Sequence, residues 1–107
     1  MKLAEQKAAT IAKGTAPLSR KEAEDLLRDI PQWSLADREI RREFRFKDFR
    51  EAMNFVNGVA AIANEQDHHP DIVISYNKVQ LTFSTHKIGG LSLNDFIVAA
   101  RVDLLAA

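Results

Sequence analysis

The fold is decided by residues 71–85, DIVISYNKVQLTFST, which have the pattern of a β-hairpin. In the second half, Val79, Leu81 and Phe83 alternate with polar side chains, which is typical of a strand with one buried and one solvent-facing side. The first half alternates less strictly, and a turn near residues 77–78 joins the two strands. A sheet built on this hairpin needs a cover on one face only.

Two further strands are predicted upstream of the hairpin. Residues 39–46 alternate apolar and charged side chains, with Arg42 the one charged residue on the otherwise apolar face. Trp33 opens a shorter extended stretch, which turns at residues 36–37. These two segments bring the predicted sheet to four strands.

From about residue 47 the apolar spacing changes to that of a helix. Its main apolar stripe consists of Phe49, Ala52, Met53, Val56, Val59, Ala60 and Ala63. Phe55 and Ile62 form a second stripe, so we expect this helix to contact more than its own sheet. Gly58 costs up to ~1 kcal/mol relative to alanine in a helix, and it would permit the close approach of a second helix.

Two capping boxes mark the beginnings of the other helices, Ser19 with Glu22 and Ser92 with Asp95. The first of these helices ends before Pro31. The predicted core residues of the second are Phe96, Ala99, Ala100 and Leu104. The order helix, two strands, long helix, two strands, helix predicts an α+β fold: a four-stranded antiparallel sheet with three helices packed on one face.

Residues 1–18 are predicted to be an N-terminal extension, and residues 19–107 a single domain. The extension shows little apolar periodicity, so we expect it to lie outside the core. Charged residues interrupt it, which disfavours a secretory signal, and the longest apolar stretches of the chain are too short to cross a bilayer. A cytoplasmic location, with no membrane partner, is therefore expected.

The composition narrows the classes of function. Lys and Arg total 15, as do Asp and Glu, so the formal net charge is zero. Nucleic-acid binders usually carry a basic face, so no nucleic-acid partner is expected, whereas a charge near zero slightly favours self-association. The chain has no cysteine, which excludes disulfides, thiolate nucleophiles and Cys-ligated zinc.

The chain places all three of its histidines at the two ends of the predicted hairpin. His68 and His69 precede Pro70 at its start, and His86 follows Thr85 at its end. Because a hairpin returns the end of its second strand to the start of its first, His86 is predicted to lie within reach of the other two.

Three hypotheses for this histidine cluster remain open on the residues alone. A metal site needs converging imidazoles, yet neighbouring side chains in extended chain point in opposite directions. A structural role would have the histidines close the end of the long helix, paired with its dipole or with Asp67. Proton transfer fits best, because imidazole titrates near neutrality. Groups that could orient the imidazoles or bind a polar edge of a substrate are Thr85, Asp95, Glu65 and Asp67.

The surrounding motifs are more specific than the histidines alone. In order, they are Asp67-His68-His69-Pro70-Asp71, Tyr76-Asn77-Lys78-Val79, Ser84-Thr85-His86, Gly90-Leu91 and Asp95. Together they resemble the pterin-4a-carbinolamine dehydratase family over roughly residues 19–105. The resemblance implies dehydration of 4a-hydroxytetrahydrobiopterin to quinonoid dihydropterin, which recycles the pterin cofactor of aromatic amino-acid hydroxylases. It implies no metal and no cofactor in the dehydratase itself.

The resemblance also assigns roles to residues of this chain. His68 and His86 are expected to carry out acid/base work and His69 to position the substrate. The predicted substrate-binding residues are Asn64, Glu65, Asp67, Pro70, Thr85 and Asp95. Asn64 departs from the family pattern, which commonly has an acidic residue four positions before the first histidine.

A homodimer or homotetramer is expected, with the doubly apolar helix of residues 49–63 as a candidate interface. Two alternatives to this function remain open. One is a protein-interaction module of the oligomerisation or coactivator type. The other is an enzyme that acts on a related pterin, such as a molybdopterin precursor.

Overall fold

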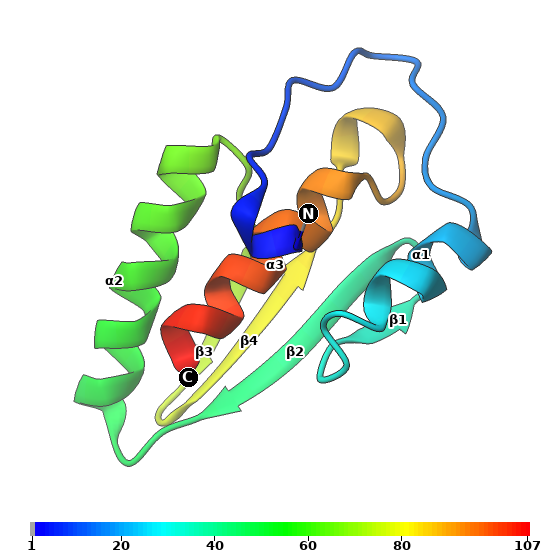
Figure 1. Cartoon of the computed structure of the whole chain (residues 1–107). Helices are drawn as coiled ribbons and strands as arrows, with labels where there is room; N and C mark the ends of the chain where they lie inside the picture. The colour runs from blue at the N-terminus through cyan, green and yellow to red at the C-terminus, as the bar shows by residue number, and fades with distance from the viewer. Residues whose placement is uncertain (1) are drawn as a thin grey trace.

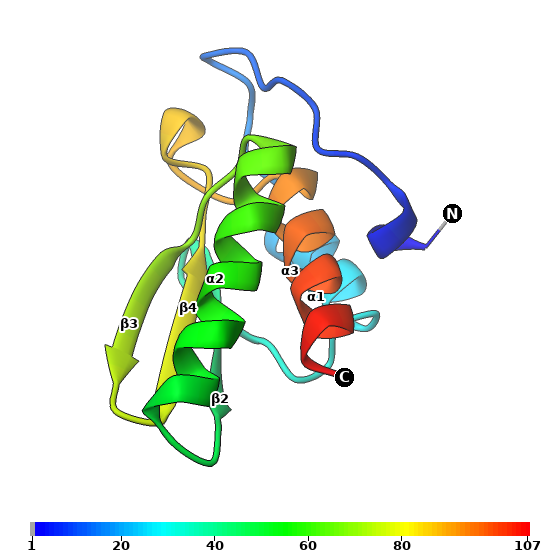
Figure 2. The same cartoon turned by 90° about the vertical axis from the view of Figure 1, so that its left-hand side faces the viewer.

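A four-stranded antiparallel sheet of order β1-β2-β4-β3 forms one layer of this computed structural model, which describes residues 2–107 (Figure 1). Its strands are β1 (Ser34–Ala36), β2 (Glu39–Arg45), β3 (Asp71–Ser75) and β4 (Lys78–Phe83). The helices are α1 (Arg20–Leu27), α2 (Phe49–Gln66) and α3 (Leu93–Ala106). They cover one face of the sheet, which is seen edge-on in Figure 2. The predicted fold class is confirmed.

The hairpin of β3 and β4 turns one residue earlier than predicted. Ser75 pairs with Lys78, so the two turn residues are Tyr76 and Asn77. Tyr76 has a positive φ of 54°. The Asn77 side chain donates a hydrogen bond to the Phe46 carbonyl at 2.9 Å, and the Phe46 N–H donates to the Asn77 carbonyl at 2.8 Å. The turn is thereby fixed to the end of β2.

Arg42, the charged residue on the apolar face of β2, is neutralised by α3. Its guanidinium lies 2.7 Å from a carboxylate oxygen of Asp103 and 4.2 Å from the centre of the Phe44 ring. The Trp33 indole N–H donates to the same carboxylate at 2.9 Å. One acidic residue of α3 therefore satisfies two polar groups at the edge of the core.

The second apolar stripe of α2 is used within the chain. Phe55 packs against Phe44 and Phe46, with ring centres 4.7 and 4.9 Å apart. A Cβ added at Gly58 would lie 2.7 Å from a methyl carbon of Leu105. The predicted close approach of a second helix at Gly58 is confirmed, and that helix is α3.

Three residues predicted to be in the core are exposed. Phe49 is 50% exposed and Leu104 is 68% exposed, and Ala60 is also exposed. Phe49 begins α2, and Leu104 lies in the last turns of α3. Each of these two therefore lies at a helix end rather than in its well-covered middle.

The expectation that the N-terminal extension lies outside the core is wrong for Leu3. This side chain is 4% exposed and belongs to the core, and its short 3₁₀ helix η1 (Leu3–Glu5) packs on α3. The reason lies in α3, where every residue from 94 to 100 is buried. A helix buried on all sides needs a cover on the side away from the sheet, and η1 supplies part of it.

Candidate active site

A cavity of about 370 Å³ opens where α2 ends and β4 leaves the sheet. All three histidines line it. The other lining residues are Ala8, Ala9, Thr10, Ile11, Gln66, Asp67, Ser84, Thr85, Lys87 and Asn94. The structure thus places His86 at the same cavity as His68 and His69, as the hairpin predicts.

The end of α2 determines where His68 and His69 lie. Asp67 follows the helix in the left-handed conformation, with φ 51° and ψ 43°. The His68 N–H donates to the Ala63 carbonyl at 3.1 Å and the Asp67 N–H to the Asn64 carbonyl at 3.3 Å. This pair of bonds is a Schellman motif, with aspartate in the position usually taken by glycine. It turns the chain sharply, so His68 leaves the helix directed towards α3.

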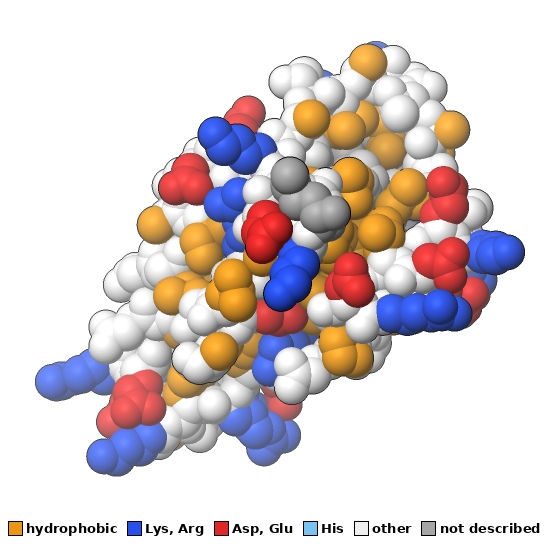
Figure 3. Space-filling model, viewed as in Figure 1, with side chains coloured by type: hydrophobic (Ala, Val, Ile, Leu, Met, Phe, Trp, Pro, Cys, Tyr) orange, Lys and Arg blue, Asp and Glu red, His pale blue; other side chains and the backbone are white. Residues whose placement is uncertain are grey.

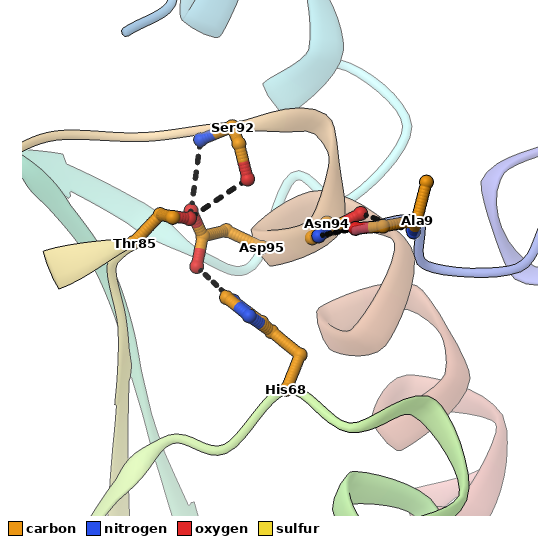
Figure 4. A network of polar contacts seen from close by, with 6 residues as sticks. All are labelled: Ala9, His68, Thr85, Ser92, Asn94 and Asp95. Carbon is orange, nitrogen blue, oxygen red and sulfur yellow. Dashed lines mark hydrogen bonds and ion pairs between the residues drawn. The ribbon is translucent and has the colours of Figure 1, made fainter. Parts of the chain in front are cut away.

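Asp95 stands behind His68 and is completely buried (Figure 4). One of its oxygens lies 2.6 Å from His68 Nε2. The other accepts hydrogen bonds from the Ser92 N–H at 2.9 Å and the Thr85 hydroxyl at 2.8 Å. The Ser92 hydroxyl, 2.7 Å from the Thr85 hydroxyl, therefore donates to it. A carboxylate that accepts on both oxygens fixes the position of the imidazole.

This contact leaves one nitrogen of His68 for chemistry. With Asp95 as acceptor, Nε2 carries the hydrogen of the bond, and Nδ1 has no protein partner among residues 2–107. The imidazole is also stacked over Phe83, with ring centres 6.2 Å apart. His68 is therefore an oriented imidazole on a cavity wall, the arrangement that proton transfer to or from a ligand requires.

The other two histidines are exposed. His69 Nε2 lies 2.9 Å from the Asn64 side-chain oxygen, so the amide of Asn64 holds this imidazole by a hydrogen bond. His86 begins the 3₁₀ helix η2 (His86–Ile88), which follows β4. The site thus combines one partly buried, carboxylate-bound imidazole with two that are open to solvent.

The predicted substrate-binding residues divide into three pairs. Asp67 and Thr85 line the cavity, whereas Asp95 and Asn64 contact histidines from outside it. Pro70 and Glu65 do neither. The Glu65 carboxylate instead contacts the Gln66 amide at 3.0 Å and Arg101 at 3.3 Å.

No group of three His, Asp or Glu side chains within residues 2–107 is arranged to hold a metal ion. The expectation that the site works without metal or cofactor stays a prediction.

Several residues of the site were not predicted from the sequence, among them Gln66 and Asn94. Both are buried amides, 9% and 6% exposed. A signal existed for each of them. Gln66 continues the apolar stripe of α2 one turn beyond Ala63, and a polar residue at a buried helical position needs a partner. Asn94 directly precedes Asp95.

The comparisons with known proteins identify the family of this chain. A family model described as pterin 4 alpha carbinolamine dehydratase matches residues 16–105. The chain belongs to this family. A Nitrosomonas eutropha relative is 48% identical over 104 residues, which cover 96% of this chain and 92% of the relative. A Rubrobacter xylanophilus relative is 46% identical over 104 residues, 96% of this chain and 97% of the relative. Both are named "Putative pterin-4-alpha-carbinolamine dehydratase".

Two solved structures share the fold. One is described as a transcriptional coactivator/pterin dehydratase from Brucella melitensis, with TM-score 0.81 and 33% identity over 85% of this chain and 99% of that chain. The other is a pterin dehydratase-like protein described as a RuBisCO assembly factor in the alpha-carboxysome, with TM-score 0.58 and 25% identity over 70% and 87% of the two chains. The family and the relatives' names support dehydratase activity for this member of the family.

The surface gives two further observations. On the helical face shown in Figure 3, basic and acidic side chains are interspersed rather than gathered by sign. Within residues 2–107, no helix is both long and apolar enough to cross a membrane.

Proposed function

We propose that the cavity binds 4a-hydroxytetrahydropterins, among them 4a-hydroxytetrahydrobiopterin, and dehydrates them to quinonoid dihydropterins. One observation carries this proposal: three histidines line a single cavity, and the buried carboxylate of Asp95 orients one of them. Family membership supports the pterin as substrate class.

The reaction requires two proton transfers. One group protonates the 4a-hydroxyl as the C4a–O bond breaks and water departs, and another removes the proton from a ring N–H, which leaves the new double bond. We assign these transfers to His68 and His86, and we assign positioning of the substrate to His69. Such acid/base catalysis contributes about 10²–10⁴-fold, which suits a dehydration that already proceeds in water. In the cell, a separate two-electron reduction would convert this quinonoid product to the tetrahydropterin that an aromatic amino-acid hydroxylase uses.

The test is a pterin-dehydration assay on the purified protein beside His68→Ala and His86→Ala. We expect each variant to lose at least about 10²-fold in turnover, because each removes a proton-transferring group. Circular dichroism should show that both variants stay folded. His69→Ala should raise KM more than it lowers kcat. Full activity of His68→Ala would refute the assignment.

A second proposal concerns self-association, and β3 is the observation that favours it. This edge strand has no partner on its outer side among the described residues, and Ile72, Val73 and Ile74 are 36%, 58% and 37% exposed. Exposed apolar edge strands tend to pair with another chain. We propose a homodimer through β3, rather than through the second stripe of α2, which the chain buries itself.

Sedimentation would test the dimer. Val73→Lys places a charge on the edge and should halve the mass of the particle, whereas Lys78→Ala on the neighbouring strand should leave it unchanged. An unchanged dimer of Val73→Lys would contradict this interface. Recovery of a different protein in stoichiometric amount, without dehydratase activity, would favour the interaction-module alternative.

A further inference from the structure

The outer wall of the cavity is built by residues 8–11, here called the strap. Figures 1 and 2 show the N-terminal segment in blue, running from η1 past the end of the molecule where α2 ends and η2 lies, before it reaches α1. All four residues, Ala8, Ala9, Thr10 and Ile11, line the same cavity as the histidines. The strap lies outside residues 16–105, which the family model matches.

Buried amide side chains hold the strap in place. The Ala8 N–H donates to the Gln66 side-chain oxygen at 2.8 Å. Asn94 makes a pair of bonds to Ala9, accepting from its N–H at 2.9 Å and donating to its carbonyl at 2.7 Å (Figure 4). Since Gln66 and Asn94 are almost fully buried, their amide groups need these partners. The strap is therefore a built part of the fold rather than a loose tail.

The anchors of the strap belong to the same segments as the site. Gln66 lies two residues before His68, and Asn94 directly precedes Asp95. A third anchor, Lys87, follows His86 and donates to the Ile11 carbonyl at 2.9 Å. The strap is thus attached to the same three segments that position the histidines.

We propose that the strap is a substrate-binding wall that sets the affinity of the site and its selectivity for the substituent on the pterin ring. This inference rests on the proposed function. The strap carries only aliphatic side chains, one hydroxyl and peptide groups, so it has no acidic or basic side chain to act in proton transfer. The reacting edge of the pterin must face the imidazoles, so the rest of the ligand faces other walls, the strap among them. Its effect therefore falls on binding.

The test compares Gln66→Leu, Asn94→Leu and Ala8→Pro with the wild type. The first two remove the anchoring amides, and the third removes only the N–H that Gln66 accepts, without touching a buried side chain. Asn54→Leu is the matched control, because Asn54 is an exposed amide of α2 that is away from the cavity. The substrates are two pterin carbinolamines, one with a 6-methyl group and one with the longer dihydroxypropyl group.

We expect KM to rise about tenfold in the anchor variants and in Ala8→Pro, because each loses one or two net hydrogen bonds that hold the strap. The value of kcat should stay within about twofold of the wild type. The ratio of the two KM values should move towards one, since a released strap no longer discriminates the substituents. Amide hydrogen exchange at Ala9 should accelerate in all three variants, and at Ala8 in the two that keep its N–H, while α2 and α3 stay protected. Asn54→Leu should match the wild type in all three readouts.

Two results would overturn the inference. Wild-type KM values in all three strap variants would show that the strap does not contact the substrate. A loss of kcat at unchanged KM would show that the anchors act on the histidines instead. Either outcome, with an active wild type, leaves the proposed function standing. A wild type without turnover of either carbinolamine would end both proposals.

Discussion

The chain contains the same helix-capping motif twice, and the two copies differ in their burial and in their partners. In the first, Glu22 accepts from the Ser19 N–H at 2.8 Å, and the Ser19 hydroxyl accepts from the Glu22 N–H at 3.1 Å, all in solvent. In the second, Asp95 also accepts from the Ser92 N–H, but it is completely buried and holds His68. The same local motif thus starts a helix in one place and supports a proton-transfer site in the other. Burial and distant partners make the difference.

The largest effect on stability should follow from Asp95→Asn. The amide keeps one acceptor oxygen and gains a donor, so Ser92, Thr85 and His68 cannot all donate to this side chain as they do to the carboxylate. Losing a buried hydrogen bond to a charged group costs about 1.5–3 kcal/mol. Urea denaturation should show an unfolding free energy lower by about that amount. A variant as stable as the wild type would contradict the proposed role of the carboxylate as an acceptor on both oxygens.

A smaller loss is expected for Thr85→Val, which removes the hydroxyl between Asp95 and Ser92 while keeping the volume. The free energy of unfolding should fall by about 1 kcal/mol, with turnover within severalfold, because His68 keeps its own contact with Asp95. Thermal unfolding and the dehydration assay check the two parts. A loss of turnover as great as that of His68→Ala would mean that Thr85 takes part in the chemistry itself.

The exposed copy of the motif should affect stability alone. Ser19→Ala removes the acceptor for the Glu22 N–H and should cost about 1 kcal/mol, the typical value for an N-cap. Turnover should not change, because α1 does not line the cavity. The same two assays apply, and a drop in turnover at full folding would show that the two motifs are coupled.

The smallest effect is a pH dependence at Glu22. The backbone N–H of Ser19, and then its hydroxyl, lower the pKa of this carboxyl from its ordinary value of 4.5. A pKa lowered by folding gives stability that is present above the ordinary value and is lost as the pH falls through the lowered one. The melting temperature of the wild type should exceed that of Glu22→Gln at pH 7, and the gap should close in acid. A gap that persists unchanged at low pH would contradict this assignment.

Much of the fold follows from local patterns in the sequence. The alternation in β2 and β4, the helical spacing of α2 and the two capping motifs suffice for the order of elements and for the one-sided sheet. The errors arose where long-range cover decides burial. Leu3 is buried because α3 needs a cover, and Leu104 is exposed because it lies near the end of that helix. Local periodicity predicts neither the burial of Leu3 nor the exposure of Leu104.

In the site too, local sequence predicts some features and tertiary packing decides the others. The three histidines could be grouped from the hairpin alone, since strand pairing returns His86 towards His68. Asp95 could be recognised as a helix cap, but its burial against His68 depends on how α3 packs across the end of α2. Gln66, Asn94 and the strap were missed, because their partners lie 58 and 85 residues apart in the sequence. Only the tertiary structure brings them together.

The central claim is that the carboxylate of Asp95 makes His68 a proton-transferring group for a pterin carbinolamine. The most direct measurement is the dehydration turnover of Asp95→Asn beside Glu22→Gln, at equal concentrations of folded protein. Both changes neutralise the acid of a capping box, so helix capping alone predicts the same result for both. We expect at least about a tenfold loss for Asp95→Asn, a share of the 10²–10⁴-fold that acid/base catalysis supplies, and wild-type turnover for Glu22→Gln. Equal turnover of the two variants would contradict the claim.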